Sequence, residues 1–191
     1  GIEAIRHMTL IHTTLPIANQ GLDRCLELLE VNPHSKSIDF LRIHALRFDS
    51  ISQEYEKRAV LEECAELFDL NDNSQLEIYC RWLGRLRAFS RLLEKLPADR
   101  SRLNEELFKI RMNALAVLGR RDDMKNELAN APAIPSQWKL IISVRLHSLS
   151  GDFDKAASDL DQLLNEVSKD TGRVLSTCRY LEASGDVRSL C

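Results

Sequence analysis

Gly-Asp-Phe-Asp-Lys-Ala, residues 151–156, separates two apolar segments of the chain. The segments on either side, 138–149 and 157–167, carry apolar residues at the three- and four-residue spacing of an amphipathic helix. Gly151 can adopt the positive φ that often ends a helix, and Asp152 can cap the helix that follows. The sequence therefore predicts two helices joined by a tight turn.

Similar turns recur along the chain. A second Gly-Asp pair begins at Gly185, and glycines also follow apolar segments at Gly119 and Gly84. Successive turns are thus separated by roughly 32 to 35 residues, and Gly21 lies about two periods before Gly84. A recurrence of this length is typical of arrays of helical hairpins, in which each hairpin buries its apolar face against its neighbours.

We therefore expect an all-α solenoid of about five to six antiparallel helix pairs, at least about 65% helical and without a sheet. The first helices of the pairs are expected at 3–18, 37–50, 74–83, 102–118, 136–149 and 171–183. The second helices are expected at 22–31, 54–69, 86–96, 122–130, 153–168 and from 187 onward. We expect residues 1–191 to form a single array, as a fragment of a longer protein, because the last pair has no polar cap.

The period, the glycine turn and the small residue that follows it resemble the tetratricopeptide repeat. The positions that carry the resemblance are Gly151, Phe153, Ala156, Leu160, Leu163 and Leu164. The turns at Gly84 and Gly119 are similar, with Phe89 and Met124 where that family prefers alanine. The family's Trp-Leu-Gly and Tyr signature is mostly absent from the first helix, and pentatricopeptide or half-a-tetratricopeptide repeats fit the same pattern. The resemblance implies a right-handed superhelix whose first helices line a concave face that binds peptides or partner segments.

Charge is unevenly distributed along the chain. The formal net charge is −3, yet residues 76–125 contain 12 basic and 7 acidic residues. Some of the basic residues share a helix face at four-residue spacing, namely Arg81 with Arg85, and Arg87 with Arg91 and Lys95. This basic segment predicts either a solvated face balanced by nearby acids or a docking site for an acidic partner. An acidic total and few aromatic residues make nucleic acid the least favoured partner.

The candidate partner-binding residues lie on the first helices of the third to fifth pairs. They are placed at or near the concave face when Gly84, Gly119 and Gly151 are aligned with the turn of the tetratricopeptide repeat. The set is Arg81, Lys109, Asn113, Trp138, Ile141 and Arg145. A basic field speeds the encounter with an acidic segment, and Trp and Arg are frequent anchors in protein interfaces.

No motif in the sequence indicates catalysis, a metal site or a cofactor. There is no nucleophile elbow, phosphate-binding loop or dinucleotide-binding motif, and the five histidines lack metal-ligand spacing. The five cysteines are widely spread, which is typical of reduced thiols in an intracellular, cytoplasmic protein. No apolar run reaches the roughly 18 residues that cross a membrane. We expect a protein without enzymatic activity and without membrane insertion in this segment.

The leading hypothesis is a protein-interaction scaffold that binds a partner peptide or domain within a multiprotein assembly. A second hypothesis is an RNA-associated helical-repeat protein that uses the basic segment 76–125. A third is a purely structural segment of a larger machine. Fold alone does not decide among the three, because function depends on the chemistry of particular sites.

Overall fold

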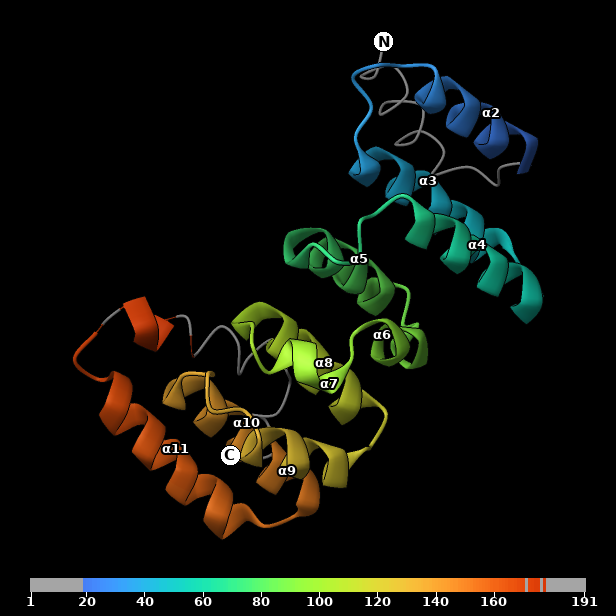
Figure 1. Ribbon diagram of the computed structural model, residues 1–191. Coiled ribbons are helices and arrows are strands. Elements are labelled where there is room, and N and C mark those ends of the chain that lie inside the picture. The colour runs from blue at the N-terminus through green and yellow to red at the C-terminus, as the bar shows by residue number, and fades with distance from the viewer. Residues whose placement is uncertain (1–18, 171, 176, 178–191) are drawn as a thin grey trace. The chain divides into compact units, whose positions relative to one another are not determined.

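The computed structural model describes residues 19–170, 172–175 and 177. Of these residues 76% are helical and none lies in a strand (Figure 1). The expectation of an all-α chain is confirmed for the described residues. The helices expected at 3–18 and from 187 onward lie outside them, as does most of the helix expected at 171–183.

The chain divides into two compact units, residues 1–82 and 83–191, and the division falls within the last turn of helix α5 (Asn73–Arg85). In the first unit, α2 (Asn19–Glu30) packs on α3 (Ser37–Ser50), and α3 packs on α4 (Glu54–Glu66). Leu22, Cys25 and Leu29 of α2 form a buried cluster with Ile43 of α3. The amphipathic spacing predicted for these segments thus produces the core of this unit.

A stack of aromatic rings forms a second part of the core in the first unit. Tyr79 lies with its ring centroid 5.8 Å from that of Phe68 and 5.8 Å from that of Trp82. The Tyr79 hydroxyl donates to the Leu61 carbonyl at 2.8 Å, and the Trp82 indole N–H donates to the Leu41 carbonyl at 3.0 Å. Because both polar groups have partners, burying these large side chains leaves no donor unsatisfied.

The second unit contains α6 (Phe89–Lys95), α7 (Ala98–Ser101), α8 (Glu105–Val117), α9 (Arg121–Ala129), α10 (Ser136–Ser150) and α11 (Phe153–Val167). Helix α8 packs on α6, α7 and α9, and α10 packs on α8, α9 and α11. The main cluster joins Phe108, Met112 and Leu115 of α8 to Met124 of α9 and Ile142 of α10. Helices α8 and α10 therefore each contact their own partner helix and the neighbouring pair.

Three turns of the second unit share one backbone geometry. The residues with positive φ are Arg87 (57°), Gly119 (69°) and Gly151 (75°), and α6, α9 and α11 each begin two residues later. The interval from Arg87 to Gly119 equals the interval from Gly119 to Gly151, and we call it the repeat interval. The prediction that Gly84 forms a turn of this kind is wrong, because Gly84 lies inside α5 and an arginine takes the left-handed position instead.

One helix boundary that differs from the prediction is the start of α8. A single helix was expected from residue 102, whereas the structure has the short α7 followed by a helix that begins at Glu105. The Asn104 side chain caps α8 by accepting a hydrogen bond from the Leu107 backbone N–H at 3.0 Å. An asparagine with this role stops the helix from extending backward, because its own backbone is extended.

Candidate functional site

Four predicted partner-binding residues come together on α8 and α10. The Lys109 ammonium lies 3.9 Å from the centroid of the Trp138 ring, within the range of a cation–π interaction. The Arg145 guanidinium donates to the side-chain oxygen of Asn113 at 2.9 Å. We call Lys109, Asn113, Trp138 and Arg145 the α8–α10 strip.

The repeat register explains why these side chains meet. Asn113 and Arg145 are separated by one repeat interval, as are the turn glycines Gly119 and Gly151. The two side chains therefore occupy the same position in successive helix pairs, and their hydrogen bond joins one pair to the next. Lys109 lies one helical turn before Asn113, which places both on one face of α8.

The residues of the predicted set differ in how much of each is exposed. Asn113 is exposed, Trp138 is half-buried against both core clusters of the second unit, and Arg145 is buried. Only 13% of the Lys109 side chain is accessible. Ile141 has no exposed surface and packs with Leu163 and Val167 in the core, so we leave it out of the strip.

Arg81, the remaining residue of the predicted set, belongs to α5 in the first unit. Its side chain is exposed, and its Nε donates to the Glu77 carboxylate one turn earlier at 2.8 Å. By residue number Arg81 precedes Asn113 by one repeat interval. Arg81 thus has the same position in the repeat as Asn113 and Arg145 have in the two helix pairs that follow.

Two arginines of the basic segment, Arg102 and Arg111, form ion pairs with a buried acid of the second unit. The Glu127 side chain is only 4% exposed and accepts from Arg102 Nε at 3.0 Å and from Arg111 Nε at 2.9 Å. Arg111 also donates to the Leu96 carbonyl at the end of α6, at 2.5 Å. These two arginines connect α6, α8 and α9 and do not form an external basic surface. The sequence analysis missed Glu127, although an acid three residues after Met124 falls on the buried face of α9.

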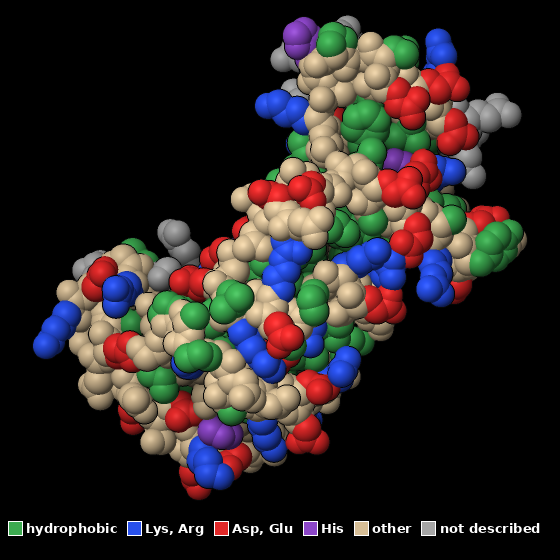
Figure 2. Space-filling model, in the orientation of Figure 1, with side chains coloured by type: hydrophobic (Ala, Val, Ile, Leu, Met, Phe, Trp, Pro, Cys, Tyr) green, Lys and Arg blue, Asp and Glu red, His purple; other side chains and the backbone are tan. Residues whose placement is uncertain are grey.

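Other basic residues of the segment are paired with nearby acids on the surface. Lys109 contacts both Glu105 and Glu106, and the remaining pairs are Arg91 with Glu94 and Arg120 with Asp123. In the view of Figure 2, acidic and basic side chains alternate over the second unit. Of the two interpretations of the basic segment, these pairs favour a charge-balanced face.

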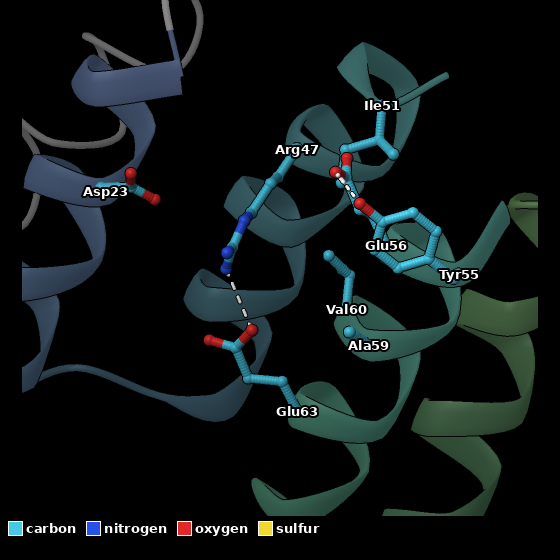
Figure 3. Close-up of a pocket in the computed structure, with 8 residues that line it drawn as sticks. All are labelled: Asp23, Arg47, Ile51, Tyr55, Glu56, Ala59, Val60 and Glu63. Atoms are coloured by element: carbon cyan, nitrogen blue, oxygen red, sulfur yellow. Dashed lines mark hydrogen bonds and ion pairs between the residues drawn. The ribbon is translucent and has the colours of Figure 1, made fainter. Parts of the chain in front are cut away.

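A pocket of about 270 Å³ lies in the first unit between α2, α3 and α4 (Figure 3). Helix α2 contributes Asp23, and α3 contributes Arg47. Ile51 directly follows α3, and the other lining residues belong to α4. The lining residues are Asp23, Arg47, Ile51, Tyr55, Glu56, Ala59, Val60 and Glu63. The sequence analysis did not identify this pocket, because residues that meet across three helices have no common spacing.

Two interactions fix the polar walls of the pocket. Arg47 donates to the Glu63 carboxylate at 2.9 Å, and the Tyr55 hydroxyl donates to the Glu56 carboxylate at 2.9 Å. The hydrogen bond to Glu56 raises the pKa of Tyr55, because the carboxylate stabilises the protonated phenol. Across the pocket, the Asp23 carboxylate has no hydrogen bond or ion pair with any described residue (Figure 3). The pocket therefore presents one carboxylate that is available to a ligand.

A cluster of Ser143, His147 and Asp159 joins α10 to α11. The Ser143 hydroxyl donates to Asp159 Oδ2 at 2.6 Å, and His147 Nδ1 lies 2.9 Å from the same oxygen. In a catalytic triad the histidine would bind the serine, whereas here both side chains bind the carboxylate. The cluster is therefore an interhelical clamp and gives no nucleophile.

The described part of the chain shows neither a metal site nor a membrane-spanning helix. Within it, no group of three His, Cys, Asp or Glu side chains has the arrangement of a metal site, and no helix is long and apolar enough to span a membrane. Comparison of the sequence with protein families, with curated proteins and with solved structures finds no match in any of the three. Function is therefore inferred from the residues themselves.

Proposed function

We propose that this chain is a tetratricopeptide-like solenoid that serves as a scaffold and binds a protein or peptide along the α8–α10 strip. The observation that carries the proposal is the Arg145–Asn113 hydrogen bond, which joins equivalent positions of successive helix pairs. In a right-handed array of helical hairpins, such positions line one continuous face. A face that continues from pair to pair suits an extended segment of a partner better than it suits a compact ligand.

The chemistry of the strip supports a peptide ligand. Asn113 is exposed and has an amide group that can both donate to and accept from a peptide backbone. Next to it, Trp138 is half-buried, so part of its side chain is accessible, and the Lys109 ammonium lies over the face of the ring. An aromatic anchor beside a hydrogen-bonding side chain is a common arrangement at protein interfaces.

The ion pairs of the basic segment are the reason to propose a protein partner before RNA. Affinity for a polyanion depends on basic side chains that exchange their counterions for phosphates. Arg102 and Arg111 are already bound to the buried Glu127, and Lys109 is bound to two glutamates. Breaking these pairs would offset part of the gain from phosphate contacts.

A matched pair of variants tests the proposal. Asn113→Lys places a cation beside Arg145 on the strip, whereas Asn126→Lys makes the same change at an exposed position of α9. Each tagged chain is used for affinity capture, and a retained protein is then purified for direct binding measurements. We expect a partner whose dissociation constant rises about tenfold with Asn113→Lys and stays unchanged with Asn126→Lys.

Two outcomes would contradict this proposal. Equal affinity of a partner for both variants would place its binding site away from the strip. Loss of all captured material after ribonuclease treatment, together with affinity that falls steeply with salt, would indicate RNA binding instead. Asn126→Lys should keep the melting temperature of the unchanged chain, whereas Asn113→Lys should lower it somewhat, because it removes the hydrogen bond to the buried Arg145; binding is therefore measured at a temperature where circular dichroism shows both variants folded.

A further inference from the structure

We infer that the pocket of the first unit binds an arginine side chain of a partner polypeptide, with its guanidinium group paired with Asp23. This site is separate from the α8–α10 strip and does not depend on the function proposed for the strip. The inference rests on the size of the pocket, the charge of its lining and the positions of its aromatic and apolar residues (Figure 3).

The size of the pocket indicates a single side chain. Its volume is about 270 Å³. Pockets for whole small-molecule ligands usually range from about 300 to 1,000 Å³. A long side chain that enters from a partner segment fits this smaller space, and the rest of the partner would remain outside it.

The charge of the lining favours a cation. Three carboxylates, those of Asp23, Glu56 and Glu63, face the pocket together with one guanidinium, that of Arg47. Glu63 is already paired with Arg47, and Glu56 accepts a hydrogen bond from the Tyr55 hydroxyl, which leaves Asp23 without a partner among the described residues. The excess of negative charge would repel an anion, whereas a basic side chain would supply the partner that Asp23 lacks.

The lone carboxylate and the apolar lining favour arginine among the basic side chains. A guanidinium is planar and can bind a carboxylate through two parallel N–H groups, whereas an ammonium is a single point charge. Tyr55 lies across the pocket from Asp23, with Arg47 between them, so its ring borders the apolar part of the lining (Figure 3). The aliphatic part of the arginine would lie along Ile51, Ala59 and Val60.

The test is an NMR titration of the whole chain with three capped tripeptides. These are acetyl-Ala-Arg-Ala-amide, its citrulline analogue, which has the same shape without the charge, and acetyl-Ala-Glu-Ala-amide. We expect saturable shifts at Asp23, Tyr55 and Ala59 with the arginine peptide and a dissociation constant on the order of 1 mM, because one side chain makes few interactions. The citrulline peptide should bind roughly threefold or more weakly, because it lacks the charge that pairs with Asp23.

Variants of α2 assign the effect to the pocket. Asp23→Asn should weaken binding of the arginine peptide roughly threefold or more, whereas Glu30→Gln, which neutralises an exposed acid outside the lining, should leave it unchanged. Equal binding of the arginine and citrulline peptides would overturn the assignment, as would equal binding by Asp23→Asn and the unchanged chain. Preference for the glutamate peptide, or no saturable shift at the pocket residues, would overturn it as well.

Discussion

Helix pairs α8–α9 and α10–α11 each contain an acid on the second helix that binds a donor on the first, and the two acids differ in burial. Glu127 binds Arg111 in the first pair, and Asp159 binds Ser143 at the positions one repeat interval later. The Glu127 side chain is 4% exposed and the Asp159 side chain is 22% exposed. The acid at this position of the repeat therefore belongs to a buried ion-pair network in the first helix pair and to a partly hydrated interhelical clamp in the second.

This difference indicates where the second unit is most sensitive to substitution. Removing one member of a buried network leaves the remaining charges poorly solvated, whereas water can replace a partner lost near the surface. Arg102 and Arg111 both depend on Glu127, and among the described residues Arg111 pairs with no second acid that could take its place. We therefore expect equivalent substitutions at the two positions to have unequal effects.

The largest effect is expected for Glu127→Ala. The substitution removes the carboxylate that binds Arg102 and Arg111 and should lower the free energy of unfolding by about 3 kcal/mol or more. Urea denaturation followed by circular dichroism would measure the loss. Arg120→Ala, at an exposed pair with Asp123, serves as a control and should change the midpoint little. A Glu127→Ala loss no larger than that of the control would show that the buried network is unimportant for stability.

The next effect concerns the contact between α10 and α11. Ala156 is completely buried, whereas the adjacent Ala157 is exposed. Ala156→Glu should destabilise the fold by roughly 2 kcal/mol or more, because it buries an unpaired charge and overpacks the contact. Ala157→Glu should leave the denaturant midpoint nearly unchanged. If both variants had the same midpoint, the orientation of α11 would be wrong.

A smaller effect is expected when two glycines are replaced by alanine, with opposite signs at the turn residue Gly151 and the helical residue Gly84. Gly151 has a φ of 75°, so Gly151→Ala should destabilise by about 1 kcal/mol, because a Cβ is disfavoured in that conformation. Gly84 lies within α5, and a Cβ there would meet only Leu92 at an ordinary 4.0 Å. Gly84→Ala should therefore stabilise the chain by up to about 1 kcal/mol. Thermal melts of the two variants should move in opposite directions, and a fall for both would contradict the turn assignment.

These turns also show how much of the fold the sequence could predict. Apolar spacing placed most helices of the described chain close to their observed positions, and the helix at 37–50 has the predicted bounds. Gly84 was misassigned because glycine after an apolar helix usually marks its end, whereas the left-handed residue is Arg87. Arginine has no preference for positive φ, so no local signal could have identified it.

The candidate site was predictable only in part, for a related reason. The alignment of the turns put Asn113 and Arg145 in one candidate set, and in the structure the two side chains meet because positions one repeat interval apart lie in successive helix pairs. The interval does not say which of these side chains reach the surface, and Ile141 proved to be completely buried. The pocket around Asp23 depends on contacts among three helices, which periodicity within one helix cannot reveal.

The smallest effect is expected at Asp159. Asp159→Asn keeps the size of the side chain and an oxygen that can accept from Ser143, and it removes the charge next to His147. Because this side chain is partly hydrated, we expect a loss of at most about 1 kcal/mol, well below the loss for Glu127→Ala. Measuring Glu127→Ala, Asp159→Asn and the double variant gives the coupling between the two positions. Near-additive losses would fit two separate clamps, one in each helix pair. If Asp159→Asn lowered the free energy of unfolding as much as Glu127→Ala does, burial would not determine how much the acid at this position of the repeat contributes to stability.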